Sequence, residues 1–275
     1  MPPRGVPTLP LARGADPGAT GGARGGRRGR DAAGRAHLEP HGGAVLAGTT
    51  AAAALFLQTL LVLVDSTGLL PRNPAFRETG AGPEQDLATY YVAYFERQHD
   101  IAWILAIRGT LGPLAALAMI VLALAFVQVR GHGRPRVHVW ALVFAVGALL
   151  NLLSDLVYLS LLGVWRFTGF TAEPPADMIA SGRSAETVAD LSSYLATAAS
   201  VTLAAALVGV AAELSARLRI LALALAAVAV VAVVASLAFW DVVADVTSIL
   251  TGAVLGPLLL VGLGRWIARS VDRRA

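Results

Sequence analysis

Cysteine and lysine are both absent from the 275-residue chain, and charged residues of any kind make up only 15% of it. Without cysteine the chain has no disulfide bond, no thiolate metal site and no cysteine nucleophile. All 22 basic residues are arginine, which together with many alanines and glycines is typical of a high-GC genome. An ordinary soluble domain carries roughly 25% charged residues, so this composition argues against a soluble protein.

Familiar catalytic and cofactor motifs are missing as well. The sequence has no His-Glu-x-x-His pair, no Gly-x-Ser-x-Gly elbow, no phosphate-binding Walker loop and no dinucleotide fingerprint. Its five histidines fall in the N-terminal tail and in predicted loops. We therefore expect no catalytic residues, no metal site and no cofactor, and an enzyme is the least favoured class.

Long apolar runs dominate what is present. Each of six runs reaches the roughly 20 residues that cross about 30 Å of hydrocarbon. Inside a bilayer the backbone must satisfy its own hydrogen bonds, so each run is expected to be a helix. The sequence predicts an all-α, polytopic membrane protein with a six-transmembrane-helix bundle. The predicted spans are 44–64, 101–129, 139–164, 191–214, 220–240 and 242–267.

Arginine placement orients the bundle. Sixteen arginines fall in the tail, the 2–3 and 4–5 loops and the C-terminus, against five in the opposite loops. By the positive-inside rule both termini are expected to be cytoplasmic, in a bacterial inner membrane, as a multi-pass protein. Residues 268–275 form a basic cytoplasmic C-terminus.

Residues 1–43 are rich in arginine and glycine and have almost no large apolar side chain, so they predict a disordered cytoplasmic tail. A plain solvated tail or a start codon assigned too early is the favoured interpretation; the alternative is that its arginines bind anionic lipid headgroups or RNA. We expect the lipid bilayer, and no nucleic acid, as a partner. The oligomeric state is left open.

The external 1–2 loop carries a predicted amphipathic helix near 83–99. Pro83 at its first position and acidic residues in the first turn are typical of a helix start. Leu87 and four aromatic residues then recur on one face. This helix is expected to lie at the outer interface or to cap the bundle, with a binding lid as the alternative. The 3–4 loop predicts a separate short helix near 184–190 that acts as a tether.

Polar residues inside the spans are the main candidates for a site. Asn151, Asp155 and Tyr158 share one helix face of the third span. Arg108, in the second span, lies at nearly the depth of Asp155, roughly 10 and 13 Å from the outer boundary at 1.5 Å per residue. An isolated charge there costs about 2.5–3.5 kcal/mol. The sequence therefore predicts an Arg108–Asp155 ion pair.

Further polar residues fall in the outer halves of other spans, whereas the cytoplasmic halves are nearly pure Leu, Ala, Val and Ile. Gln58 lies in the first span, and Asp245 and Ser248 lie in the sixth. This pattern predicts a water-accessible polar pocket that opens outward above an apolar plug. The alternative is that these residues are only interhelical hydrogen-bond contacts.

The second and sixth spans both contain Leu-Gly-Pro-Leu, at 111–114 and 255–258. Because proline removes a backbone donor, a kink is expected at each site. Gly252 and Gly256 form a small-xxx-small packing face. A true internal repeat is not favoured, because the two intervals do not divide the chain into equal halves.

The stretch from Ser248 through the Gly-Pro helix to the Gly-Arg exit at Arg265 resembles the uncharacterised small six-transmembrane-helix membrane proteins of high-GC bacteria. That resemblance covers the membrane portion and implies no activity.

The sequence thus favours a protein that binds or transports a small molecule, an ion or a proton-linked solute. Asp155 is then the protonatable or ligand-binding group, Arg108 is its counter-ion, and Asn151, Tyr158 and Gln58 line the site. The alternatives are a structural or assembly protein with no ligand site and, least favoured, a membrane-embedded enzyme. The sequence does not indicate the substrate.

Overall fold

A computed structural model describes residues 40–66, 70–71, 74–165, 174–238 and 241–272. The chain divides into two units, residues 1–38 and 39–275, and all described residues belong to the second. Most of the predicted disordered tail, and the last three residues of the basic C-terminus, lie outside the described part.

Six helices are long and apolar enough to cross a membrane. The described residues include no strand, so the predicted class, an all-α polytopic bundle, is confirmed. The first five spans are α2 (Pro40–Ser66), α4 (Ala102–Arg130), α5 (Pro135–Ser160), α7 (Pro175–Val210) and α8 (Ala216–Leu237). The sixth is made of α9 (Asp241–Ile249), a π-helical segment η3 (Leu250–Leu255) and α10 (Gly256–Asp272). The remaining elements are α3 (Pro83–Asp100), α6 (Leu162–Trp165) and the single turn η2 (Ala211–Glu213).

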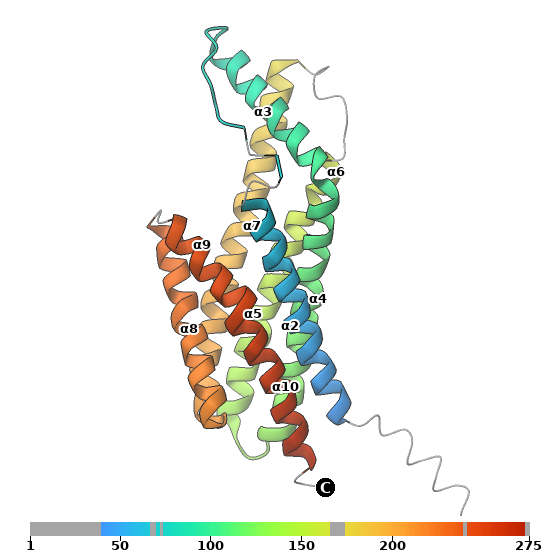
Figure 1. Cartoon of the computed structure of the whole chain (residues 1–275), viewed down its shortest axis with the longest axis vertical. Helices are drawn as coiled ribbons and strands as arrows, with labels where there is room; N and C mark the ends of the chain where they lie inside the picture. The colour runs from blue at the N-terminus through green and yellow to red at the C-terminus, as the bar shows by residue number, and fades with distance from the viewer. Residues whose placement is uncertain (1–39, 67–69, 72–73, 166–173, 239–240, 273–275) are drawn as a thin grey trace, which may run out of the picture. The chain divides into compact units, whose positions relative to one another are not determined.

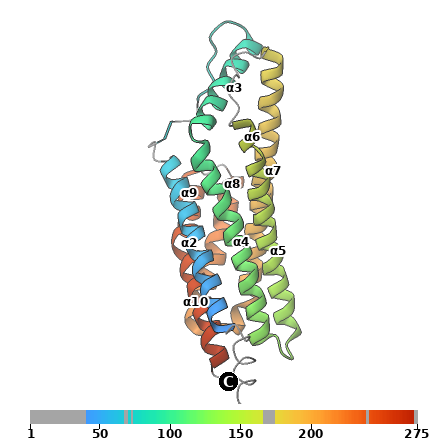
Figure 2. The same cartoon turned by 90° about the vertical axis from the view of Figure 1, so that its right-hand side faces the viewer.

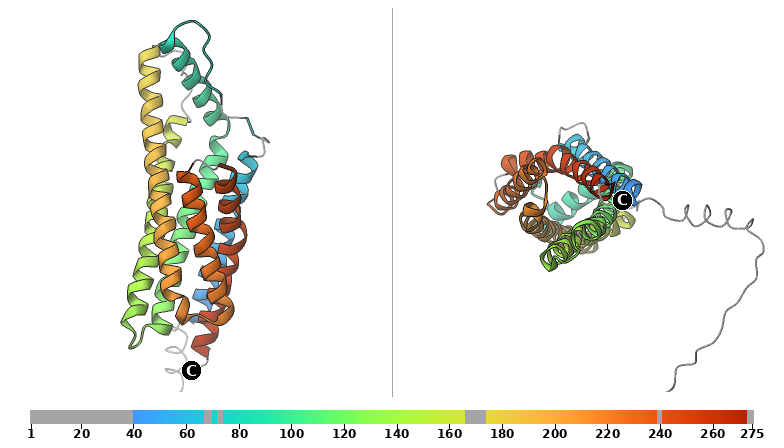
Figure 3. Two further views of the ribbon diagram at one scale, coloured as in Figure 1. Left: turned by 90° about the vertical axis from the view of Figure 1, so that its left-hand side faces the viewer. Right: turned by 90° about the horizontal axis from the view of Figure 1, so that it is seen from below.

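The six spans form a closed ring. Going round it, α2 packs on α4, α4 on α5, α5 on α7 and α7 on α8. Helix α8 then packs on α9 and η3, and α10 packs on α2 (Figure 1; Figure 3, right). Only one residue separates the predicted spans 220–240 and 242–267, which favours close packing of these two helices, and α8 and α9 do pack on each other.

The ring closes where α2 crosses α10, at two glycines. A Cβ on Gly48 would lie 2.6 Å from the Leu260 carbonyl oxygen, and a Cβ on Gly264 would lie 2.6 Å from the Ala44 carbonyl oxygen. Each glycine therefore lets the facing backbone approach closely, which is how small residues hold membrane helices together. Farther along, Gly252 packs on Thr59 and Gly256 on Leu55, as expected of a small-residue face.

Helix α7 extends well beyond the membrane. Its 36 residues span about 54 Å at 1.5 Å per residue, against about 30 Å of hydrocarbon. The prediction of a separate short helix near 184–190 is wrong, because Pro175 starts one helix that runs unbroken to Val210. The polar sequence there marks the part of a long helix outside the membrane.

The segment expected to form an amphipathic helix near 83–99 lies in α3, which packs along the N-terminal part of α7 (Figures 1 and 2). Tyr91 and Phe95 are buried in an aromatic cluster with Met178 of α7. Tyr91 donates a hydrogen bond of 2.9 Å to the Glu186 carboxylate. Arg97 forms an ion pair with Asp65, which fastens α3 to the end of α2. The helix thus caps the bundle, one of the two arrangements expected from its sequence.

The two glycine-proline motifs behave differently. Helix α4 continues through Pro113 without a break. In the sixth span the π-helical segment directly precedes Gly256 and Pro257. Proline lacks the N–H that would bond four residues back, and the wider turn absorbs the mismatch. Such π segments occur often at functional sites.

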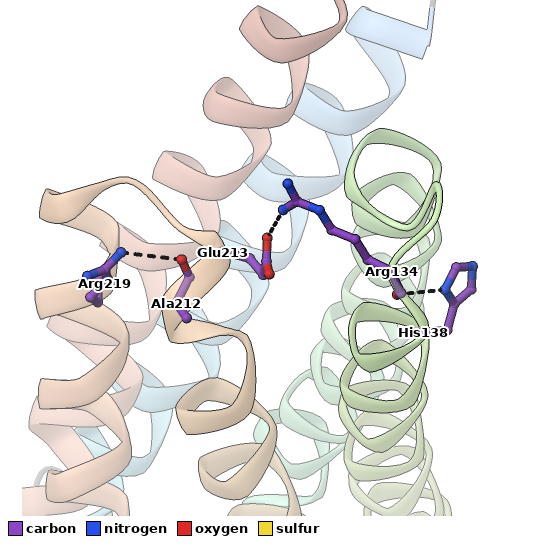
Figure 4. Close-up of polar contacts among 5 residues, drawn as sticks. All are labelled: Arg134, His138, Ala212, Glu213 and Arg219. Atoms are coloured by element: carbon purple, nitrogen blue, oxygen red, sulfur yellow. Dashed lines mark hydrogen bonds and ion pairs between the residues drawn. The ribbon is translucent and has the colours of Figure 1, made fainter.

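At the opposite end of the bundle, arginines fasten the short turns. Arg134 forms an ion pair with Glu213 of η2. Arg219 donates to the carbonyl oxygens of Ala211 and Ala212, at 3.0 and 3.3 Å. The His138 ring nitrogen lies 3.2 Å from the Arg134 carbonyl oxygen (Figure 4). We call this end, with its two short turns and the end of α10, the arginine-rich end.

Candidate functional site

The Asp155 carboxylate joins three helices within the membrane region. Gln58 of α2 donates its side-chain amide to one carboxylate oxygen at 3.3 Å. Asn151, one turn earlier on α5, donates to the other oxygen at 3.1 Å. Two neutral amides therefore satisfy the carboxylate in apolar surroundings, where an unpaired charge is costly.

The third helix, α4, has a glycine where it faces the carboxylate. A Cβ on Gly112 of α4 would overlap the Asp155 carboxylate. Gly112 thus provides the space in which the carboxylate packs against the α4 backbone. Sequence reasoning assigned Gly112 only to the kink at Pro113 and missed this role.

Arg108 is placed differently from the prediction. The ion pairs within the described residues are Arg97–Asp65 and Arg134–Glu213, so the direct Arg108–Asp155 ion pair is wrong. The Arg108 guanidinium lies over the Tyr158 ring instead, 5.6 Å from its centroid. It still attracts the Asp155 carboxylate through space. The Tyr158 ring is the partner of Arg108, and the two amides are the partners of Asp155, whereas the sequence predicted that the two charges would pair with each other.

A second polar contact joins α5 to α7. The Ser154 hydroxyl donates to the Ser192 carbonyl oxygen at 2.8 Å, and the Ser192 hydroxyl donates to the Ser154 carbonyl oxygen at 3.0 Å. Both side chains are buried. Ser192 lies inside the predicted span 191–214 but was not among the expected site residues, because a serine in one helix does not reveal its partner in another.

Between Asp155 and the arginine-rich end, the six spans line a partly open cavity of about 220 Å³. All six spans contribute to its wall. Its polar lining comes from Asn151, Ser200, Ser248 and Thr251. The apolar lining consists of Leu55, Ala115, Met119, Phe144, Leu203, Ala204, Leu207, Leu225, Ala229, Ala232, Gly252, Gly256 and Leu260.

No ionisable side chain is among the described residues that line this cavity. Asn151 connects it to Asp155, because the same side chain borders the cavity and donates to the carboxylate. The π-helical segment supplies Thr251 and Gly252 to the wall. A space of this chemistry suits a small, uncharged and largely apolar molecule with one or two hydrogen-bonding groups.

Toward the arginine-rich end the packing becomes wholly apolar. A residual space of about 30 Å³ there is surrounded by side chains such as Leu122, Phe126, Leu259 and Leu263. Phe126 and Leu259 are buried, and no polar side chain borders this space among the described residues. The layer is apolar, and it lies in the half of the spans where the sequence predicts an apolar plug.

The predicted site residues thus fall into two groups. Gln58, Asn151 and Asp155 form one hydrogen-bonded cluster, with Tyr158 and Arg108 beside it. Ser248 lines the cavity, whereas Asp245, one turn earlier on α9, is exposed and does not. Among the described residues, no group of three His, Asp or Glu side chains is arranged to hold a metal ion.

These features define an integral membrane protein: six spanning helices surround a cavity, and the Asp155 carboxylate is held by Gln58 and Asn151 next to it. Comparison of the chain with protein-family models, with curated proteins and with solved structures gives no match.

Proposed function

We propose that the chain binds a small, uncharged solute in the central cavity and carries it across the membrane. The observation that supports this most directly is the cavity itself, about 220 Å³ within the ring of all six spans. A cavity of about 150 Å³ holds benzene, so by proportion this one holds a molecule of about nine heavy atoms.

Asp155 is the candidate for coupling this solute to protons. Its carboxylate accepts the Asn151 amide, and Asn151 borders the cavity. A protonated carboxyl presents a donor where the carboxylate had only acceptors. Protonation would therefore change the hydrogen bonding of Asn151 and, through it, the polarity of the cavity wall.

We also infer that the arginine-rich end faces the cytoplasm of a bacterial cell, so that the cavity opens outward. Arginine placement supports this orientation. The apolar layer around Phe126 and Leu259 supports closure toward the cytoplasm.

Single cysteines test this function, because the natural chain has none. Ser248→Cys and Ser200→Cys, both on the cavity wall, are expected to react with a water-soluble thiol reagent added outside cells. Leu263→Cys, in the apolar layer, and Leu124→Cys, on the exposed apolar surface of α4, are the unreactive controls.

Protection identifies the solute. Small neutral alcohols and amides are screened for slowing the labelling of Ser248→Cys without slowing that of a loop cysteine. The same cysteine-bearing protein in vesicles is then tested for uptake of the protecting compound. Cavity cysteines that label no faster than Leu124→Cys would rule out the proposal.

A structural role is the second candidate, and the hydrogen bonds of the Asp155 carboxylate to two helices favour it. Two amides and Gly112 hold Asp155 as a tie between three helices. The double variant Arg108→Leu with Asp155→Leu separates the two roles. A folded double variant that no longer transports the solute supports the cavity function, whereas normal behaviour in the cell supports the structural role.

A further inference from the structure

Arg130, the last residue of α4, has an unusual environment at the arginine-rich end. Its guanidinium lies over the Trp266 ring of α10, 4.8 Å from the centroid. Its Nε is buried and finds no hydrogen-bond partner among the described residues. Trp266 is held in turn by Phe126, whose ring centroid lies 6.0 Å away. The guanidinium is thus stacked on the ring, and its buried Nε has no hydrogen-bond partner among the described residues.

The surroundings have a strong excess of positive charge. Seven arginines belong to the described segments 127–138, 211–220 and 262–272, against two acidic residues, Glu213 and Asp272. Glu213 is already paired with Arg134. Arg265 and Arg269, the arginines on the same helix as Trp266, are both exposed. An anionic group is therefore the complement of this surface.

The position of Arg130 and Trp266 at the ends of spanning helices indicates which kind of anion would bind there. Arg130 ends a membrane-spanning helix and Trp266 lies in the last two turns of another. Tryptophan is favoured at the level of lipid headgroups. A planar guanidinium matches the oxygens of a phosphate group in a two-bond fork. Lipid phosphates are at the same depth as the end of a spanning helix, and stacking on Trp266 leaves the edge of the guanidinium for such a group.

We propose that Arg130, stacked on Trp266, binds the phosphate of an anionic phospholipid at the ends of α4 and α10. The lipid is a resident of the leaflet at the arginine-rich end. This site is separate from the central cavity, so that either proposal stands or fails without the other.

Lipid titration of the full chain in neutral detergent tests the site. Dioctanoyl phosphatidylglycerol is the anionic probe, and dioctanoyl phosphatidylcholine and inorganic phosphate are the comparison probes. The readout is the rise in thermal unfolding midpoint with probe concentration, which gives an apparent dissociation constant. We expect Arg130→Gln to weaken phosphatidylglycerol binding about tenfold, the loss of one charge-assisted hydrogen-bonded contact.

Two further variants sharpen the result. Arg136→Gln removes an exposed arginine from the same end and is expected to change the constant less than twofold. Arg130→Lys keeps the charge but loses the planar fork, so it is expected to weaken binding severalfold. Because lysine keeps the long side chain, it also serves if the glutamine variant fails to fold.

Three outcomes would overturn the proposal. Equal effects of Arg130→Gln and Arg136→Gln would mean that only the summed charge attracts lipid. Equal stabilisation by phosphatidylcholine would remove the need for an anionic lipid. If inorganic phosphate alone saturated the rise in the unfolding midpoint, the ligand would be a free phosphate anion and not a lipid.

Discussion

At the scale of single residues, the membrane interior makes Asp155 depend on its neighbours. A carboxylate there costs about 2.5–3.5 kcal/mol unless it is compensated. Gln58 and Asn151 compensate it with amide hydrogen bonds, and the Arg108 charge attracts it from over the Tyr158 ring. Because the two amides bind the carboxylate, Arg108 does not contact Asp155 directly and stacks on the Tyr158 ring instead.

A double-mutant cycle measures the tie between α2 and α5. Gln58→Leu and Asp155→Leu, which each remove one partner of the hydrogen bond, are expected to show a coupling free energy of about 0.6 kcal/mol and at most about 1.7 kcal/mol, the average and the maximum found for hydrogen bonds between membrane helices. Unfolding in a detergent mixture, followed by circular dichroism, provides the four stabilities. Strictly additive effects would mean that the 3.3 Å contact contributes nothing to the fold.

Gly112 gives a steric prediction. Gly112→Ala places a methyl group where the Asp155 carboxylate lies, so we expect a loss of about 1–3 kcal/mol in the free energy of unfolding, as for other overpacked sites. Gly43→Ala is the matched control, because a Cβ there meets nothing within 4 Å and alanine favours a helix. If both variants were equally stable, the carboxylate would not pack on α4.

At the scale of helices, the departures from regular α-helix follow local rules. The sixth span widens into a π-helical segment just before Pro257. Helix α7 is longer than a membrane span because no proline within it follows Pro175, where the helix begins. The first departure places Thr251 and Gly252 on the cavity wall. The second gives α3 a surface to pack on.

Restoring the missing backbone donor is expected to change the cavity wall. Pro257→Ala returns an N–H that can bond the Ala253 carbonyl and favour a regular α-helix over η3. Removing the extra residue from that wide turn rotates the preceding helix by about 100°, one residue of an α-helix. We expect thiol labelling of Ser248→Cys to fall severalfold in this background.

Pro113→Ala provides the control for that experiment. Helix α4 is already continuous through Pro113, so the labelling of Ser248→Cys should not change. Unchanged labelling in both backgrounds would show that proline does not set the register of the sixth span.

The capping helix α3 gives a prediction about alkaline pH. Burial, together with the hydrogen bond to Glu186, raises the pKa of Tyr91 from its usual 10.0 to about 12. Burial also raises the pKa of Tyr94 to about 12. Between these two pH values the folded chain keeps phenol protons that the unfolded chain loses. Stability is therefore fully present below pH 10.0 and falls as the pH rises toward about 12.

Thermal unfolding across that pH interval checks this prediction. Tyr91→Phe has no phenol to titrate, so its stability should fall less steeply than that of the natural chain. Tyr94 retains its own contribution, so some slope remains. Identical slopes for the two proteins would contradict the assignment of a raised pKa to Tyr91.

At the scale of the whole molecule, the sequence predicts the number and approximate position of the spans because hydrocarbon imposes one length and one backbone solution on each. It also places Arg108 and Asp155 at nearly matching depths and Gln58 in the outer half of its span. Depth does not specify which faces meet, and the predicted ion pair with Arg108 failed for that reason. Gly112 was missed because its contribution is the absence of a side chain.

The orientation of the bundle is the prediction that concerns the molecule as a whole. His132→Cys, in the exposed turn between α4 and α5, should react with a membrane-impermeant thiol reagent only after the cells are opened. Glu78→Cys, in the exposed loop before α3, should react with intact cells, because the positive-inside rule leaves that loop outside. The opposite pattern would place the arginine-rich end outside, and the cavity would then open toward the cytoplasm. Labelling of both cysteines in intact cells would indicate a mixture of orientations, which sixteen arginines on one side against five are expected to prevent.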